Sequence, residues 1–382
     1  ELSLEAKTEN KGEVTIKGQK VPYRVVTGTM PVWDDEGKAI AGLFYVYYER
    51  TDVTKKDERP LVISFNGGPG TASVWMHLGY TSPRKLKIDE EGYPIQPYGF
   101  EENPNSIIDV ADIVYIDPVN TGFSRILDKA VPTSKFFGVN ADVKYLADWI
   151  NTFVGRNKRW ASPKYLIGES YGTTRVSGLS LELQNKHWMF LNGVVLVSPT
   201  DLGIKRDGPA SAALRVPYMA ATAWFHKKLP ADLQSKDLTA FLPEVEAFTL
   251  NELLPTLSKG WNIEADKKKE VTKKLARYIG LSETAVTQQN LEIPFDFFWK
   301  ELLRDQGKTV GRLDSRYIGI DKKDAGTGPD YNAELTSWEH SFTPAINIYL
   351  RDQLGYKTDL NYYIFGPTFP WDNNNNKTGD DL

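Results

Sequence analysis

Tyr165-Leu166-Ile167-Gly168-Glu169-Ser170-Tyr171-Gly172 is the stretch of this chain that decides the fold. A short apolar run ends in a serine between two glycines, and the residues after it, 173–183, are suited to a helix. A glycine on each side lets a strand turn sharply into a helix and holds the serine hydroxyl exposed at the bend. The motif therefore predicts a nucleophile, Ser170, although a serine hydroxyl is a poor nucleophile without a base.

The composition of the chain describes a globular protein with a large core. Its 382 residues are 41% hydrophobic and 25% charged, which suits one large domain or two coupled ones. A net charge of −4 gives no electrostatic reason to expect nucleic acid or an anionic membrane as a partner. Without cysteine there is no disulfide or thiolate nucleophile, and no histidine pair has metal-ligand spacing. We therefore expect no metal and no cofactor.

The apolar pattern changes along the first half of the chain. Residues 1–50 contain alternating runs, as in antiparallel strands at a sheet edge. Short, continuously apolar runs then suit strands buried on both faces of a parallel sheet: 61–65, 113–116, 165–167 and 194–197. Between two of them, residues 143–154 have the apolar spacing of a helix. Strand and helix therefore alternate, which predicts an α/β domain with its ligand site at the carboxyl ends of the strands.

The second half of the chain is helical in character. We expect residues 201–340 to form a helical insertion that lies over the sheet, with its aromatic residues as core packing. The core then comprises residues 1–200 and 341–382. Residues 361–365 are the clearest strand candidate near the end, and residues 371–382 are expected to form a loop. No run reaches the roughly 18 apolar residues of a membrane span.

A second glycine-rich motif, Asn66-Gly67-Gly68-Pro69-Gly70, also follows a buried strand directly. Alone it is best explained as a tight turn. Two such motifs at the ends of two strands, however, are able to place a nucleophile beside an oxyanion site. The backbone N–H groups of Gly68 and Tyr171 would be its donors.

Together, residues 66–70, 105–125 and 168–172 resemble the serine carboxypeptidases of peptidase family S10, and the motifs stand in the family's order. The resemblance implies an α/β-hydrolase fold with a helical cap, which cleaves single residues from peptide C-termini through an acyl-enzyme. It further implies a peptide with a free C-terminus as substrate and a secreted or periplasmic, bacterial-type member of the family. It gives no indication of oligomeric state or side-chain specificity.

The resemblance also assigns roles to residues. Ser170 is the expected nucleophile, and Gly68 and Tyr171 are the expected oxyanion donors. Asn66 and Glu169 match the residues that bind the substrate's terminal carboxylate. The Asn66 amide is able to donate to a carboxylate, whereas Glu169 donates only when protonated, and a bound carboxylate should raise its pKa.

Several positions depart from the family pattern. Ser64 replaces a tryptophan and Thr71 a cysteine, and no acidic partner for Glu169 stands within residues 78–81. The first departure weakens the carboxylate site, and the last puts an acidic pH optimum in doubt. Arg125 is either a structural ion-pair partner or a site residue, and we favour the structural role.

The larger departure is the missing base. The family's triad continues with Asp and His on strands after a segment that resembles residues 363–373. We expect these two residues beyond Leu382 and a sheet that lacks its last strands, so that this chain alone is inactive. His340 matches a segment upstream of the triad Asp and is a weak substitute. The alternatives are an inactive peptide-binding homologue and an acyltransferase or esterase that uses the same site.

Overall fold

The computed structural model of the protein describes residues 2–200 and 207–374. The chain divides into two compact units. Unit 1 comprises the residues up to 204 together with those from 340 onward, and unit 2 comprises residues 205–339. All the motifs singled out above lie in unit 1.

An eight-stranded mixed sheet forms the centre of unit 1, in the order β1-β2-β3-β7-β4-β9-β10, with β8 paired to β3. Strands β1 to β3 pair antiparallel, and β7, β4, β9 and β10 run parallel to one another. The strands are β1 (Lys7–Ile16), β2 (Gln19–Trp33), β3 (Ala39–Arg50), β4 (Leu61–Phe65), β7 (Asp112–Ile116), β8 (Arg125–Ile126), β9 (Lys164–Glu169) and β10 (Gly193–Val197). The expected α/β fold with antiparallel edge strands is confirmed.

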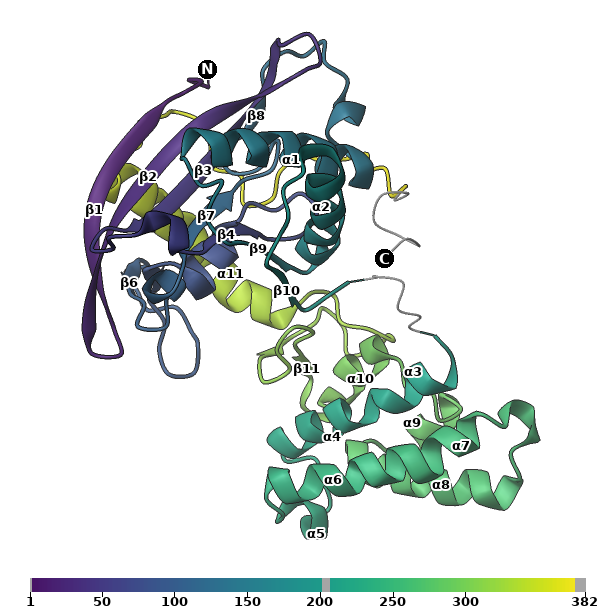
Figure 1. Cartoon of the computed structure of the whole chain (residues 1–382). Coiled ribbons are helices and arrows are strands. Elements are labelled where there is room, and N and C mark those ends of the chain that lie inside the picture. Colours follow the sequence, from purple (N-terminus) through teal and green to yellow (C-terminus); the bar gives the residue numbers. More distant parts are fainter. Residues whose placement is uncertain (1, 201–206, 375–382) are drawn as a thin grey trace. The chain divides into compact units, whose positions relative to one another are not determined.

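Helical segments cover both faces of this sheet. Those of unit 1 used below are α1 (Val139–Arg156), α2 (Tyr171–His187) and two π-helical turns, η2 (Met76–Thr81) and η8 (Ile348–Gln353). Neighbouring residues of a strand point to opposite faces. Tyr47 accordingly packs on Phe153 of α1, with 5.2 Å between ring centroids, while the Tyr48 hydroxyl lies 2.7 Å from that of Tyr349 in η8. Helices α1 and α2 lie together against the Tyr47 face (Figure 1).

Strand β10 departs from the expectation of strands buried on both faces. It is the last strand in the order of the sheet. Val194, Val195 and Leu196 are 38%, 47% and 39% exposed. A continuously apolar run predicts burial, but this strand has a sheet neighbour, β9, on one side only among the residues that the structure describes.

The prediction of a strand at residues 361–365 is wrong. These residues make isolated bridges, Tyr363 with Gly122 and Phe365 with Thr71, and extend no strand of the main sheet. Their run of aromatic and β-branched residues has a high strand propensity, but a strand also needs a pairing partner, and only isolated bridges form here. The loop expected over residues 371–382 lies outside the described residues from 375 onward.

Unit 2 is mainly helical and has a hydrophobic core of its own. Its elements are α3 (Gly208–Leu214), α4 (Val216–Phe225), α5 (Ala231–Gln234), α6 (Leu238–Phe248), η5 (Thr249–Leu253), α7 (Leu254–Leu257), α8 (Ala265–Ile279), α9 (Glu283–Gln288), α10 (Phe295–Glu301), β11 (Thr309–Val310), β12 (Ile318–Gly319) and the start of α11 (Ala333–Asn347). Helix α8 buries Leu275 and Ile279 and ends at Gly280, whose φ of 68° is the left-handed conformation of a helix stop. Phe298 and Trp299 of α10 are buried in this core, as expected.

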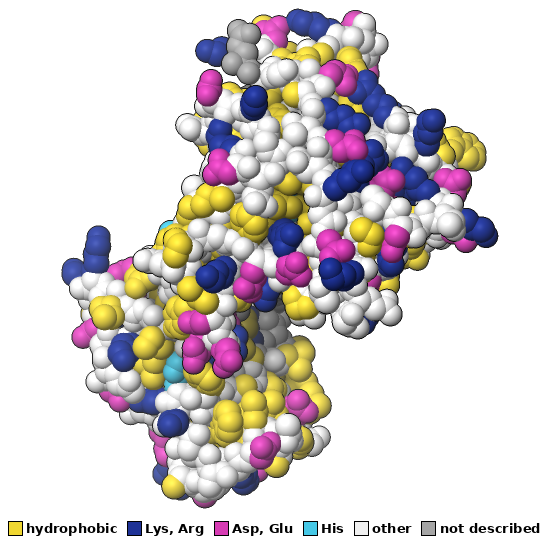
Figure 2. Space-filling view, turned by 90° about the vertical axis from the view of Figure 1, so that its left-hand side faces the viewer, with side chains coloured by type: hydrophobic (Ala, Val, Ile, Leu, Met, Phe, Trp, Pro, Cys, Tyr) yellow, Lys and Arg dark blue, Asp and Glu magenta, His cyan; other side chains and the backbone are white. Residues whose placement is uncertain are grey.

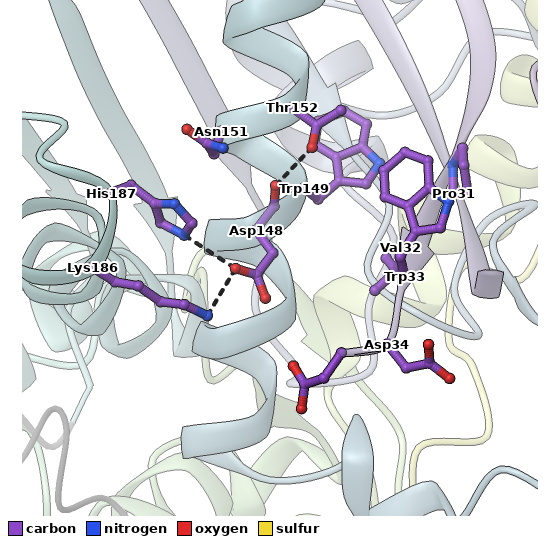
Figure 3. A pocket seen from close by; sticks show the side chains of 11 residues that line it. Pro31, Val32, Trp33, Asp34, Asp148, Trp149, Asn151, Thr152, Lys186 and His187 are labelled. Atoms are coloured by element: carbon purple, nitrogen blue, oxygen red, sulfur yellow. Dashed lines mark hydrogen bonds and ion pairs between the residues drawn. The ribbon is translucent and has the colours of Figure 1, made fainter. Parts of the chain in front are cut away.

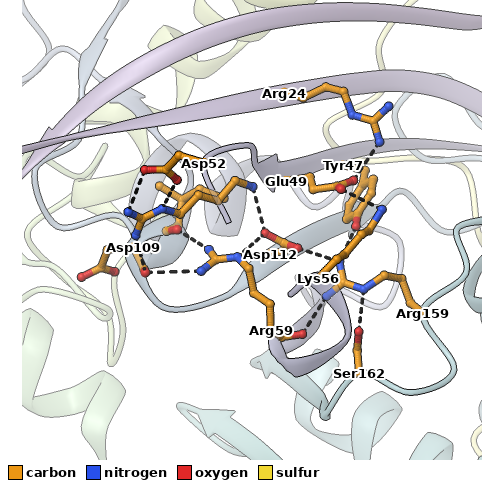
Figure 4. Close-up of polar contacts among 12 residues, drawn as sticks. Arg24, Tyr47, Glu49, Asp52, Lys56, Arg59, Asp109, Asp112, Arg159 and Ser162 are labelled. Carbon is orange, nitrogen blue, oxygen red and sulfur yellow. Dashed lines mark hydrogen bonds and ion pairs between the residues drawn. The ribbon is translucent and has the colours of Figure 1, made fainter. Parts of the chain in front are cut away.

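A buried charge cluster joins the amino ends of β4 and β7. The Asp112 carboxylate accepts from Arg59 Nε and from Arg159 Nη1, each at 2.6 Å. Figure 4 shows Asp112 between the two guanidinium groups. Asp112 and Arg159 are fully buried, and Arg59 is 8% exposed. This cluster lies at the end of the parallel strands opposite to the one that carries the glycine-rich motifs.

The surface carries charges of both signs. On the face drawn in Figure 2, basic and acidic side chains lie interspersed, in keeping with the net charge of −4. Across residues 2–200 and 207–374, no helix is both long and apolar enough to cross a bilayer.

Candidate active site

Ser170 occupies a strained turn between β9 and α2. It is the residue that separates the last residue of β9 from the first of α2. Its φ of 55° and ψ of −126° lie in a region that residues other than glycine rarely adopt. A Cβ atom at Gly168 would stand 2.0 Å from the Gly172 carbonyl oxygen, so a side chain at this position would prevent the turn. The strand-turn-helix context predicted for the motif is therefore present.

Hydrogen bonds to its backbone hold Ser170 in this conformation. The Ser170 N–H donates to the Val197 carbonyl at 3.0 Å. The Ser170 carbonyl accepts from the Thr173 N–H at 2.9 Å and from the Thr173 hydroxyl at 2.7 Å. Thr200 N–H donates in turn to the Thr173 hydroxyl at 3.1 Å. Hydrogen bonds with the end of β10 and with the first turn of α2 thus hold Ser170 in its strained conformation.

The loop of residues 66–70 lies directly against this turn. A Cβ atom at Gly67 would stand 2.5 Å from the Tyr171 nitrogen, so only glycine allows the approach. The Gly67 carbonyl accepts from the Thr71 N–H at 3.2 Å. Because N–H and C=O point in opposite directions across a trans peptide, this bond directs the Gly68 N–H away from Thr71. Tyr171 is the first residue of α2, where backbone N–H groups have no acceptor within the helix.

The two residues expected to bind a terminal carboxylate contact each other. Asn66 is fully buried, and its Nδ2 donates to Glu169 Oε2 at 3.0 Å while its Oδ1 accepts from the Met76 N–H at 2.8 Å. Burial raises the pKa of Glu169 above its usual range, and the hydrogen bond from Asn66 opposes this shift. Glu169 is partly exposed, so it is the member of the pair that faces outward.

Tyr80 of η2 is a residue of this region that sequence reasoning missed. It stands in the segment where the sequence offers no acidic partner for Glu169, and it is 56% exposed. Burial of its hydroxyl and the nearby Glu169 carboxylate raise the pKa of Tyr80. The Asn103 amide fixes the Tyr80 carbonyl with a bond of 2.8 Å. A phenol therefore lies near Glu169, in the segment that offers it no acidic partner.

The segment 363–372 lies alongside the 66–70 loop. Ala72 N–H donates to the Ile364 carbonyl at 2.9 Å, and Gly366 N–H donates to the Gly70 carbonyl at 2.8 Å. Nearby, Arg125 donates to the Gly122 carbonyl at 2.9 Å and stacks its guanidinium 4.1 Å from the centre of the Tyr363 ring. Arg125 thus holds backbone segments together, which is a structural role.

Each of the four histidines of the chain has a polar partner other than Ser170. Their partners in the described ranges are the Tyr48 hydroxyl for His77 (2.6 Å), Asp148 for His187 (3.1 Å), the Ser315 carbonyl for His226 (2.6 Å) and the Tyr98 hydroxyl for His340 (2.8 Å). Burial lowers the pKa of His77 to about 3, so it is neutral at ordinary pH. Within residues 2–200 and 207–374, no three acidic or histidine side chains gather in a way that would hold a metal ion.

A cavity of about 290 Å³ lies between the end of β2 and helices α1 and α2. In Figure 3, Lys186 and His187 point toward Asp148 across it, and Lys186 Nζ lies 2.9 Å from the carboxylate. Helix α2 has 17 residues, so about 25 Å of helix separates His187 at its last turn from Ser170 at its start. This cavity is therefore not part of the Ser170 site.

Residues 16–201 match the profile of a family described as serine carboxypeptidase, peptidase S10. Serine carboxypeptidase S10 family member 1 of Dictyostelium discoideum is 27% identical over 149 residues, 38% of this chain and 33% of that protein. Serine carboxypeptidase-like 7 of Arabidopsis thaliana is 25% identical over 217 residues, 55% of this chain and 46% of that protein. A solved structure of Kex1(delta)p, a prohormone-processing carboxypeptidase from Saccharomyces cerevisiae, is 17% identical with a TM-score of 0.42, over 68% of this chain and 53% of that one. The matches to these two curated relatives span less than half of each relative's length.

Proposed function

We propose that this protein, whose residues 16–201 match the serine carboxypeptidase profile, removes C-terminal residues from peptides through an acyl-enzyme on Ser170. The observation that carries the proposal is the strained backbone of Ser170 beside the 66–70 loop. In the proposed reaction, the Ser170 hydroxyl attacks the last peptide carbonyl. The N–H groups of Gly68 and Tyr171 stabilise the oxyanion, and a histidine moves the proton.

The base is the part of this proposal that the described residues do not supply. Each of their histidines has the partner given above. We therefore assign the proton transfer to the Asp–His pair that the family's triad implies for the whole protein. The proposal accordingly concerns the whole protein rather than this chain alone.

A fluorophosphonate probe tests the nucleophile. The whole protein is expected to form a covalent adduct, located at Ser170 by peptide mass spectrometry, because such probes capture a serine that is activated by a base and an oxyanion site. The Ser170→Ala variant should not react. An unlabelled Ser170, in a sample where an added serine hydrolase reacts, would support an inactive peptide-binding protein instead.

Blocking the C-terminus tests the exopeptidase assignment. A peptide with a free carboxyl terminus is expected to lose its last residue, and the same peptide with an amidated terminus should be a much poorer substrate. Product masses distinguish the two. Equal cleavage of both peptides, or hydrolysis of esters alone, would point to an esterase or acyltransferase that uses Ser170.

The pH dependence of binding tests the carboxylate site. Since the pKa of Glu169 is raised, its protonated form persists above the range of an ordinary glutamate and donates to a substrate carboxylate. KM for a free-carboxylate peptide should therefore be low below this pKa and rise as pH increases through it. Glu169→Gln is a donor at every pH, so its KM should lose this dependence.

The control for this prediction is Glu90→Gln, because Glu90 is an exposed glutamate of a surface loop. It should keep the wild-type profile of KM against pH. The amidated peptide, which lacks the carboxylate, should show no such rise with either enzyme. An unchanged pH profile in Glu169→Gln would remove Glu169 from the carboxylate site.

We further propose a secreted or periplasmic location. The support is the match of residues 16–201 to the serine carboxypeptidase profile. Fractionation of the source cells followed by activity labelling is expected to find the protein outside the cytoplasm, and a purely cytoplasmic signal would contradict this location.

A further inference from the structure

Arg175 is fully buried one turn into α2, just behind the turn that carries Ser170. Its Nε donates to Asp142 Oδ2 of α1 at 2.6 Å. Its Nη1 donates to the Asn66 carbonyl at 2.8 Å, and its Nη2 donates to the Pro69 carbonyl at 3.0 Å. One side chain therefore joins α1, α2 and both ends of the 66–70 loop.

These contacts fix peptide groups on either side of Gly68. An acceptor bonded to a rigid donor cannot rotate freely about its backbone, and the N–H of the same peptide is fixed with it. The Asn66 and Pro69 carbonyls bind Arg175, and the Gly67 carbonyl between them binds the Thr71 N–H at 3.2 Å. The orientation of the Gly68 N–H therefore depends on the bonds that flank it.

Asp142 supplies the counter-charge for the buried Arg175 guanidinium and links it to the loop after β7. A buried guanidinium without a partner is strongly unfavourable, and Asp142, 1% exposed, supplies the opposite charge. The Asp142 Oδ1 accepts from the Tyr145 hydroxyl at 3.0 Å, and that hydroxyl accepts from the Val119 N–H at 3.2 Å. Arg175 is thus held by groups that are themselves hydrogen-bonded.

We propose that Arg175 is a positioning residue for the oxyanion site: it holds the 66–70 loop against the Ser170 turn so that the Gly68 and Tyr171 N–H groups face the same point. This inference rests on the proposed acyl transfer at Ser170. The alternative is that Arg175 only stabilises the fold. The positioning role and the purely structural role predict different values of kcat for a variant without Arg175. A misplaced oxyanion donor raises the energy of the transition state and leaves substrate binding unchanged, so it lowers kcat.

The first test is Arg175→Met in the whole protein, assayed with a free-carboxylate peptide. Loss of one oxyanion donor or a shift of about 1 Å in a reacting group costs on the order of 100-fold in rate. We expect kcat to fall by about 100-fold while KM changes by less than about 3-fold. A wild-type kcat in this variant would overturn the inference.

The matched control is Arg159→Met, which removes another fully buried arginine that is paired with an aspartate, at the opposite end of the parallel strands. It should lower the thermal midpoint to a similar extent yet leave kcat within about 3-fold of wild type. Equal losses of kcat in the two variants would show that Arg175 acts through stability alone.

A double variant tests further whether the loss of kcat follows from lost stability or from lost positioning of the loop. It combines Asp142→Leu with Arg175→Met. Replacing a buried ion pair by apolar groups is often neutral for stability. The double variant should recover thermal stability relative to Arg175→Met and keep its low kcat, because the donors to Asn66 and Pro69 remain absent. Recovery of kcat together with stability would overturn the inference.

Hydrogen exchange of the backbone gives a readout that needs no catalysis. In Arg175→Met, the backbone N–H groups of Gly67, Gly68, Gly70 and Thr71 should exchange at least about 10-fold faster, with β4 unchanged as internal reference. Unchanged exchange there overturns the inference even if the protein proves inactive. If Arg175→Met does not fold, Arg175→Lys, which keeps the charge but not the planar fork, is measured in the same way. If the wild-type protein is inactive, this result contradicts the proposed function, whereas the exchange measurement still tests whether Arg175 orders the 66–70 loop.

Discussion

Ser170→Ala is expected to lower kcat by about 10⁶-fold, because removal of the nucleophile from a serine protease triad costs this much. The acyl-enzyme is then impossible, and only the slow attack of water assisted by the oxyanion site remains. KM or the dissociation constant for a free-carboxylate peptide should change little, since the groups proposed to bind the substrate are intact. Steady-state hydrolysis and peptide binding by calorimetry measure the two quantities.

The control for Ser170→Ala is Ser180→Ala, on the same helix, where the hydroxyl bonds only to carbonyls of the preceding turn. It should retain wild-type kcat. A variant with Ala at position 170 that still turns over peptide would refute the assignment of the nucleophile. Ser170→Gly is equally inactive in this scheme but relieves the strain at φ 55°, so it should be more stable by about 1 kcal/mol.

Asp112→Asn is expected to destabilise the protein by about 3–5 kcal/mol, the usual cost of breaking a buried ion pair on one side. The substitution leaves the Arg59 and Arg159 guanidinium groups buried without a counter-charge. The Arg50 N–H, which donates to Asp112 Oδ1 at 2.9 Å, keeps an acceptor if the amide oxygen faces it. Urea unfolding followed by fluorescence measures the change in free energy.

The control for Asp112→Asn is Asp128→Asn, since Asp128 pairs with Lys38 at the surface, where solvent screens the charges. Its unfolding midpoint should stay unchanged. In folded Asp112→Asn, kcat should equal that of wild type, because the cluster lies at the far end of the strands from Ser170. A stability loss no larger than that of the surface variant would show that the cluster contributes little.

The elements with strong local patterns could be predicted from the sequence. The run 61–65 coincides with β4, and the apolar spacing over 143–154 falls inside α1. The expectation of full burial failed at β10, and the strand expected at 361–365 did not form. Both errors have one cause: the local apolar pattern reports what a segment is able to do, whereas its pairing and its burial depend on neighbours far away in the chain.

The residues of the candidate site also differ in how well the sequence predicts them. The glycine motifs around Ser170 and Gly68 signal a close backbone approach, because only glycine fits where the two segments meet. Arg175 and Asp142 carry no such signal, since a charged residue on an amphipathic helix usually faces water. Their pairing becomes visible only when α1 and α2 lie side by side.

The hydrogen bonds between Gly70 and Gly366 and between Ala72 and Ile364 have a consequence for biosynthesis. All of unit 2, residues 205–339, is translated between the two segments that make this contact. A nascent chain therefore carries the 66–70 loop and the Ser170 turn long before the segment that flanks the loop leaves the ribosome. Contacts of such long sequence separation form late in folding. The loop around the nucleophile is thus completed only after unit 2 has been synthesised, later than the strands β4 and β9 that support it.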